Sequence, residues 1–188
     1  MRPVADRLDG KRFYALDFDN GAVWLSKDAG ATFTRQPTRG LPEGLAPERP
    51  TWREGAWPLM ASPGGVGELW FVSRIGLFRS RDGGRSFTRL ASSIEVEVLA
   101  FGKAAPGKVY PALFAIGRQG SLRAIWRSDD AASNWIQVND AAHEYGRRFR
   151  CLAADPRVFG RVYVGTDGRG ILLGEPAGSL RGKNSLSI

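Results

Sequence analysis

The stretch Phe78–Leu90 reads "FRSRDGGRSFTRL" and holds two serines, an aspartate and two glycines between two aromatic residues. Two further segments align with it without gaps, "WLSKDAGATFTR" from Trp24 and "WRSDDAASNWIQ" from Trp126. The shared frame runs aromatic, any, Ser, any, Asp, any, Gly, any, Thr or Ser, aromatic. The third copy departs from this frame, because Ala132 replaces the glycine and Asn134 replaces the Thr or Ser. A frame that recurs in this way indicates a chain built from like units.

The frame makes physical sense as a clasp between two strands. Its aspartate can accept hydrogen bonds from backbone N–H groups of its own turn, and its glycine can adopt a positive φ without a Cβ clash. We expect the last aromatic side chain to turn inward and pack under the hairpin. Three copies of a ligand site are the alternative interpretation. The predicted structural residues are Ser26, Asp28, Gly30, Phe33, Ser80, Asp82, Gly84, Phe87, Ser128, Asp130 and Trp135.

Strand–turn–strand patterns precede each frame, namely "RFYALDFDNGAVWLS", "ELWFVSRIGLFRS" and "KVYPALFAIGRQGSLRAIWRS". A fourth unit, "RVYVGTDGRGILLGE", has the strands but no frame after them. Units of about four short strands at this period are typical of propeller blades. The sequence therefore predicts an all-β propeller of about four blades, over residues 1–45, 46–95, 96–147 and 148–188. A partial arc would expose unpaired edges, so we expect a partner carrying further blades, a self-associated copy, or closure into a small ring.

The bulk composition bounds the class of protein. With 188 residues and 43% apolar residues, the chain is long enough for one domain with a sizeable core. The single cysteine, Cys151, excludes an internal disulfide, and its neighbours Phe149 and Leu152 predict that it is buried. With one histidine as well, neither a metal site nor a cofactor is predicted. No apolar run approaches the ~18 residues of a membrane span, and "MRPVADRLDGKRF" lacks the apolar core of a secretory signal.

The charge balance is strongly basic, with a formal net charge of +8 and a pI of about 10.2. The positive residues are mostly arginines, and they are scattered singly along the chain. Scattered arginine is more typical of a solvated surface than of a stripe that follows nucleic acid phosphates. The sequence therefore favours neither a nucleic acid nor a membrane as a partner.

The C-terminal third carries the most specific signal. The segments "IWRSDDAASNWIQVNDAAHEYG" (125–146) and "DPRVFGRVYVGTDGRGILLGEP" (155–176) closely resemble the last blades of glycoside hydrolase family 74. The segments "AFGKAAPGKVYPALFAIG" (100–117) and "PVADRLDGKRFYALD" (3–17) are also similar to that family. The repeated frame itself resembles the Asp-box, or BNR repeat, of sialidases and several glycoside hydrolases. The resemblance to family 74 covers essentially the whole chain.

The resemblance implies a secreted enzyme that cleaves xyloglucan, a β-1,4-glucan, with two seven-bladed propellers and a cleft between them. It also implies an inverting pair of aspartates, one acid and one base, which must stand about 6.5–9.5 Å apart. Both aspartates fall upstream of this chain as we align it, so no catalytic residue is predicted here and the isolated chain is expected to be inactive. The chain would supply scaffold and cleft wall. A non-catalytic module that binds a glycan or a partner protein is the alternative.

Two carboxylate pairs alternate with apolar residues, Asp17 with Asp19 and Glu95 with Glu97. On a strand, residues i and i+2 share one face and lie about 7 Å apart, which is near the spacing of an inverting pair. Adjacent carboxylates on one face more often mark the solvent side of a half-buried strand. We therefore interpret both pairs as solvent-facing.

Four residues are candidates for contact with a carbohydrate. Trp52 and Trp57 lie in a loop rich in proline and glycine, where exposed aromatic rings can stack on sugar faces. His143 and Tyr145 lie in "NDAAHEYGRR", a segment that the resemblance places near the cleft or in a packing contact. Packing between blades is the alternative interpretation for all four.

Overall fold

In the computed structural model, the described residues are 1–49, 58–140, 149–168 and 170–176, and they form four antiparallel sheets in chain order. Sheet 1 consists of β1 (Val4–Ala5), β2 (Phe13–Asp17), β3 (Ala22–Ser26) and β4 (Thr34–Arg35). Sheet 2 consists of β5 (Leu59–Ala61), β6 (Leu69–Ser73), β7 (Gly76–Ser80) and β8 (Thr88–Leu90). Sheet 3 consists of β9 (Glu95–Gly102), β10 (Ala112–Gln119), β11 (Leu122–Ser128) and β12 (Ile136–Gln137). Sheet 4 consists of β13 (Phe149–Ala154), β14 (Val162–Thr166) and β15 (Ile171–Gly174).

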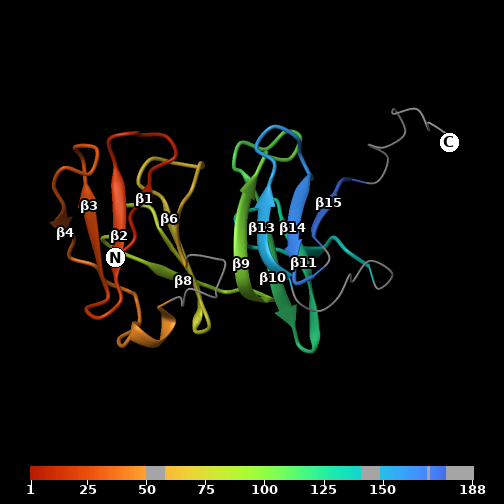
Figure 1. Cartoon of the computed structure of the whole chain (residues 1–188), viewed down its shortest axis with the longest axis horizontal. Coiled ribbons are helices and arrows are strands. Elements are labelled where there is room, and N and C mark those ends of the chain that lie inside the picture. The colour runs from red at the N-terminus through yellow and green to blue at the C-terminus, as the bar shows by residue number, and fades with distance from the viewer. Residues whose placement is uncertain (50–57, 141–148, 169, 177–188) are drawn as a thin grey trace.

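Every sheet is an up-and-down meander in which each strand pairs with the next one in the chain. Figure 1 shows sheet 1 at one end of the molecule and β15 at the other, with sheets 2 and 3 between them. Within the described residues a hydrophobic core joins each sheet to the next one, but none joins sheet 4 to sheet 1, so the sheets form an open arc and not a small ring. The predicted all-β arc of propeller blades is confirmed. A short 3-10 helix, η1 (Ala46–Glu48), lies in the connection between sheets 1 and 2.

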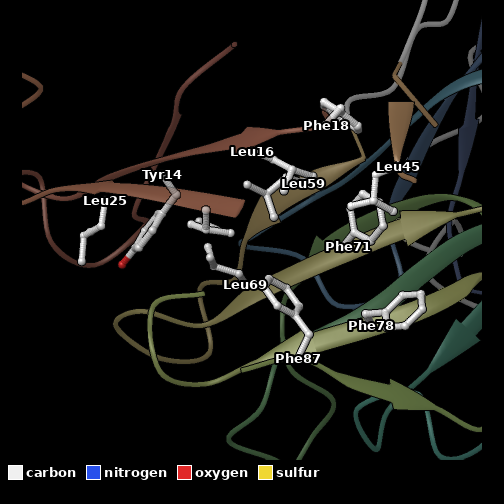
Figure 2. Packing of buried hydrophobic residues seen from close by; sticks show 12 residues of the cluster. Tyr14, Leu16, Phe18, Leu25, Leu45, Leu59, Leu69, Phe71, Phe78 and Phe87 are labelled. Carbon is white, nitrogen blue, oxygen red and sulfur yellow. The ribbon is translucent and has the colours of Figure 1, made fainter. Parts of the chain in front are cut away.

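Neighbouring sheets pack face to face, and strand β6 shows how its sequence permits this. Leu69 and Phe71 belong to the core between sheets 1 and 2, while Trp70 and Val72 belong to the core between sheets 2 and 3. Side chains alternate between the two faces of a strand, so a strand with apolar residues at every position is buried on both sides. Figure 2 shows the first of these cores, with residues from both sheets meeting between the ribbons.

The apolar run in β10 has the same explanation. Leu113 and Ala115 face sheet 2, and Phe114 and Ile116 lie in the core shared with sheet 4. This core also contains Val162, and it holds sheet 4 against sheet 3.

One predicted burial and one predicted strand position are wrong. Cys151 is exposed, because it lies on the face of β13 that points away from sheet 3. Its side chain lies over Gly165 of β14, which has no side chain of its own. Asp19 is exposed, as expected, but it lies in the turn after β2 and not on a strand, and its backbone N–H donates to Asp17 at 3.0 Å. Glu95 and Glu97 do share the exposed face of β9, as expected.

Candidate functional site

The Asp-box of sheet 2 connects β7 to β8, and Asp82 organises it. The Asp82 Oδ1 atom accepts the Ser80 hydroxyl at 2.8 Å and the backbone N–H of Ser86 at 2.9 Å. It also accepts the backbone N–H of Arg85 at 3.0 Å, while the Ser86 hydroxyl donates to Oδ2. The Ser80 hydroxyl oxygen in turn accepts the backbone N–H of Gly84 at 3.0 Å. Both oxygens of the carboxylate are therefore hydrogen-bonded within its own turn.

The other two boxes repeat this network. Asp28 accepts the Ser26 hydroxyl at 2.7 Å and the backbone N–H of Thr32 at 2.9 Å. Asp130 accepts the Ser128 hydroxyl at 2.8 Å, and the side-chain amide of Asn134 donates to it at 2.7 Å. The amide therefore replaces the hydroxyl that the other boxes use, and the third box keeps its geometry despite the changed residue.

These hydrogen bonds stabilise the ionised form of each carboxylate. Bonds from Thr32 and Ser26 lower the pKa of Asp28 to about 2. Partial burial acts to raise the pKa of Asp82 and Asp130, but the hydrogen bonds outweigh it, and both pKa values are lowered. A carboxylate held ionised in this way accepts hydrogen bonds and is a poor proton donor.

The box aromatic residues pack toward the preceding sheet and not only under their own hairpin. Phe87 is buried in the core between sheets 1 and 2, and Trp135 packs against the core between sheets 2 and 3. Phe33 belongs to sheet 1, which no described sheet precedes, and it is half-buried. Gly84 of the Asp-box also lies close against the preceding sheet, since a Cβ on Gly84 would lie 2.6 Å from a methyl carbon of Val23 in sheet 1.

Hydrogen bonds join the chain after β4 to the Asp-box of sheet 2. The Thr38 hydroxyl donates to the carbonyl of Gly84 at 2.9 Å and accepts the backbone N–H of Val23 at 2.8 Å. Arg39 exchanges two backbone hydrogen bonds with this box, one to the carbonyl of Arg85 and one from the N–H of Phe87, both 2.9 Å. The boxes therefore join neighbouring sheets as well as neighbouring strands.

A second recurring contact was not found from the sequence. Asp6 accepts the backbone N–H of Leu8 at 2.8 Å and the hydroxyl of Tyr14 at 2.9 Å. In sheet 4, Asp155 accepts the backbone N–H of Arg157 at 2.7 Å and the hydroxyl of Tyr163 at 3.3 Å. We call this pairing the Asp–Tyr latch, formed by Asp6 with Tyr14 and by Asp155 with Tyr163. Its signal is an Asp and a Tyr eight residues apart, with an arginine two residues before the tyrosine, in "ADRLDGKRFY" and "ADPRVFGRVY".

In sheet 2 the corresponding loop contains a buried polar cluster that reaches sheet 3. Glu68 is buried and forms an ion pair with Arg79. The Tyr110 hydroxyl donates to Glu68 at 2.7 Å and accepts the indole N–H of Trp70 at 3.1 Å. Burial raises the pKa of Tyr110 to about 12. Each charged or polar group named in this cluster has a partner. We therefore interpret the cluster as a structural contact between sheets 2 and 3.

The opposite end of the sheets carries the connection that leads to the predicted glycan residues. Arg49 forms an ion pair with Asp19 at 2.7 Å, in the turn of sheet 1. Glu48 forms an ion pair with Arg74 at 3.2 Å and accepts its backbone N–H at 2.9 Å, in the turn of sheet 2. These contacts fix η1 between the two turns. The four predicted carbohydrate residues lie outside the described residues, namely Trp52, Trp57, His143 and Tyr145.

A shallow cavity of about 280 Å³ opens beside the box of sheet 1. Its charged groups are Lys27, Asp28 and Arg85, and the Arg85 guanidinium donates to the buried Gln36 at 3.2 Å. Among the residues that the structure describes, no three His, Cys, Asp or Glu side chains gather as metal ligands would. The same residues contain no helix long and apolar enough to cross a membrane.

Comparison with known proteins shows which enzymes this chain is similar to. No protein-family model matches the chain. A xyloglucanase from Acetivibrio thermocellus is 41% identical over 175 residues, and a xyloglucanase from a Paenibacillus species is 38% identical over 185 residues. These alignments cover 93% and 95% of this chain. The crystal structure of a GH74 enzyme from Niastella koreensis superposes with a TM-score of 0.74 at 30% identity, over 94% of this chain.

The chain is of the GH74 type. It spans only 17–19% of the length of the two curated relatives and 25% of the Niastella chain. The four sheets of this GH74-type chain therefore match a minor part of each relative.

Proposed function

We propose that this chain is a non-catalytic part of a glycoside hydrolase that acts on xyloglucan. It supplies scaffold and one wall of the glucan cleft, and the catalytic acid and base lie outside residues 1–188. The proposal is carried by the 41% and 38% identity to two xyloglucanases over more than nine-tenths of this chain.

The described carboxylates support a non-catalytic role. An inverting hydrolase needs one carboxyl group whose pKa is raised, so that it holds a proton for the leaving group. Every described carboxyl group with a resolved shift has a lowered pKa, and these are Asp6, Asp17, Asp28, Asp82, Glu97, Asp130 and Asp155. Such groups are ionised at neutral pH and serve as hydrogen-bond acceptors.

The carboxylate pair on β9, Glu95 and Glu97, shows why these groups do not act as proton donors. The Glu97 carboxylate accepts Arg118 at 2.9 Å and Arg123 at 2.8 Å, one on each oxygen. Burial acts to raise the pKa of Glu97, but the two guanidinium groups outweigh it and lower the pKa. Glu97 is therefore committed to surface ion pairs, and Glu95 beside it is exposed.

The glucan contacts that we propose are Trp52, Trp57, His143 and Tyr145. Aromatic rings with a few polar groups are the usual lining of a ligand cleft. The ion pairs of Glu48 and Arg49 support this assignment, because they hold the chain that leads directly into the tryptophan segment. The polysaccharide partner is then a β-glucan, and blades outside this chain complete the cleft.

Affinity electrophoresis in gels that contain xyloglucan tests this proposal. We expect the chain to be retarded by xyloglucan and not by a gel of equal density that contains pullulan. The double variant Trp52→Ala, Trp57→Ala should lose most of this retardation, whereas Val109→Ala, at a fully exposed position, should keep it. Equal migration of all three proteins with and without xyloglucan would contradict the proposed contact.

The alternative is a module that binds a partner protein through its end sheets, and the exposed apolar side chains of β15 favour it. The neighbouring coding sequence discriminates the two functions. Further blades and two acidic residues encoded in the same frame support the hydrolase, and a free-standing frame supports the module.

A further inference from the structure

The shallow cavity beside the Asp-box of sheet 1 is lined by residues from two sheets. Its volume of about 280 Å³ is close to the roughly 300 Å³ at which pockets for small ligands begin. The chain of sheet 1 contributes Lys27, Asp28 and Gln36 to the wall, and the Asp-box of sheet 2 contributes Arg85. The fold therefore brings together cations that stand singly in the sequence.

The Arg85 guanidinium is held by Gln36, a side chain that is 7% exposed. The Gln36 amide nitrogen donates to the carbonyl of Thr34 at 3.1 Å, which leaves the amide oxygen facing Arg85. That oxygen accepts the Nε–H of Arg85 at 3.2 Å. The two Nη groups of Arg85 have no acceptor among the described residues. An arginine fork oriented in this way matches the planar geometry of a carboxylate.

The charges that line the cavity leave a positive excess of one. Lys27 and Arg85 are two cations, and Asp28 is one anion, because hydrogen bonds within its own turn lower its pKa to about 2. Lys27 is exposed, and no carboxylate of the described residues pairs with it. The exposed Arg39 lies beside the cavity, since its backbone N–H donates to the carbonyl of Arg85 at 2.9 Å. The lining therefore matches a ligand with a single negative charge.

The pair of Gln36 and Arg85 does not belong to the repeated frame. At the junction of sheets 2 and 3 the equivalent residues are Leu90 and Ser133, by their spacing from the box aspartates. Leu90 packs against the apolar core of that junction. An apolar side chain at this position is therefore compatible with the packing of two sheets, and packing does not explain the buried amide of Gln36. Orientation of the Arg85 fork into the cavity explains it.

The rest of the lining favours a sugar acid over a nucleic acid. The hydroxyl-bearing Thr32 and Thr34 line the cavity, together with the apolar side chain of Leu25. Hydroxyl groups can bind ring hydroxyls, and an apolar side chain can cover the C–H face of a pyranose ring. No aromatic side chain of the described residues lines the cavity, whereas proteins that bind single-stranded nucleic acids stack the bases on aromatic rings. Because the cavity is shallow, the neighbouring units of a polymer can extend into solvent.

We propose that this cavity binds one uronate unit of an acidic polysaccharide. The carboxylate of the uronate pairs with the Nη groups of Arg85 and with the ammonium group of Lys27. The ion pairs of Glu48 and Arg49, which hold the chain that leads to the proposed xyloglucan contacts, lie at the opposite end of the sheets. The uronate site is therefore separate from the glucan cleft. The inference goes beyond the proposed function and does not depend on it.

Titration of the ¹⁵N-labelled chain with trigalacturonate, followed by NMR, tests the inference. Backbone amide signals of residues 25–36 and 84–86 should shift and saturate, and the signals of sheet 4 should stay in place. The methyl-esterified trisaccharide has the same rings without the charges, and it should shift none of these signals. Because the probe is a short acid, the titration reports a site and not the general attraction of a basic protein for a long polyanion.

Two variants test the residues of the site. Arg85→Gln should weaken binding by about tenfold, the usual effect of losing one hydrogen bond to a charged group. Gln36→Leu keeps every charge and introduces the residue type of position 90, so it should fold with an unchanged circular dichroism spectrum and still bind more weakly than the parent. The matched control is Arg157→Gln, which removes an exposed arginine of sheet 4 and should bind like the parent.

Several results would overturn the inference. These are the absence of saturating shifts, shifts spread over the whole basic surface, and an equal response to the methyl ester. Parent-like affinity in Arg85→Gln or in Gln36→Leu would overturn it as well. A thymidine hexanucleotide that shifts the same amides and binds as tightly as trigalacturonate would show a general polyanion surface, and the assignment to a uronate would be wrong.

Discussion

Gly84, in the Asp-box of sheet 2, lies directly against Val23 of sheet 1, so close that a Cβ on the glycine would stand 2.6 Å from a methyl carbon. The contact joins the local geometry of one hairpin to the packing of two sheets. The same turn gives Asp82 hydrogen bonds from Ser80, Arg85 and Ser86. The Asp-box of sheet 2 therefore stabilises its own turn and also packs sheet 2 against the preceding sheet.

The close approach predicts a large effect of Gly84→Ala. The left-handed φ of +87° and the clash with Val23 both oppose a side chain. We expect the free energy of unfolding to fall by about 3 kcal/mol, the sum of left-handed strain and overpacking. The matched control is Gly30→Ala, which has a φ of +90° and open space at its Cβ position, and should cost about 1 kcal/mol. Urea unfolding measures both, and equal losses would mean that the inter-sheet contact contributes nothing.

Ala29 predicts a gain in stability. This residue has a φ of +60°, a region that strains any side chain, and the second box has Gly83 at the equivalent position with a φ of +72°. Ala29→Gly should raise the free energy of unfolding by about 1 kcal/mol, because it removes the left-handed strain. Ala31→Gly, two residues along in the same exposed turn and without a positive φ, should be neutral or destabilising. A thermal melt of the two variants side by side decides the matter.

The lowered pKa of Asp28 predicts a pH dependence of stability. A carboxylate whose folded pKa is about 2, against an ordinary 3.8, stabilises the fold above pH 3.8. This contribution is lost as the pH falls from 3.8 toward 2. The difference in unfolding midpoint between the parent and Asp28→Asn should therefore be constant from pH 5 to 7 and should shrink in that acidic window. A difference that stays constant down to pH 2 would show that the charge of Asp28 is not what stabilises the turn.

The buried cluster between sheets 2 and 3 predicts that Tyr110→Phe is costly. Loss of the hydroxyl leaves the indole N–H of Trp70 without its acceptor and removes one donor from Glu68. An unsatisfied buried polar group costs about 1–3 kcal/mol, and we expect a loss of unfolding free energy in that range. Tyr163→Phe is the control, because its hydroxyl makes one longer bond at an exposed site. The two variants should differ clearly in chemical unfolding, and similar losses would contradict the role given to the cluster.

The recurrence of the frame around Asp28, Asp82 and Asp130 was sufficient to predict the hairpins and the order of the sheets. The prediction succeeded because each box is local, with every partner of the aspartate within four residues. Contacts between sheets have no such signature. Asp6 and Gly67 are 61 residues apart, and only the fold brings them together.

The burial of Cys151 was wrongly predicted for a related reason. Apolar neighbours along the chain indicate a strand, but they do not say whether another sheet covers its second face. Leu152 packs against sheet 3, while Cys151 points the other way. The glycan residues were proposed from residue type and family resemblance, and Trp52, Trp57, His143 and Tyr145 remain predictions.

A reducing-end assay of the purified chain on xyloglucan tests the central claim most directly. Every described carboxyl group with a resolved pKa shift has a lowered pKa, so we predict no release of new reducing ends above the buffer control at any pH from 4 to 8. Xyloglucan hydrolysis that scales with the amount of chain and survives repeated purification would contradict the account, because it would place a working acid and base within these 188 residues.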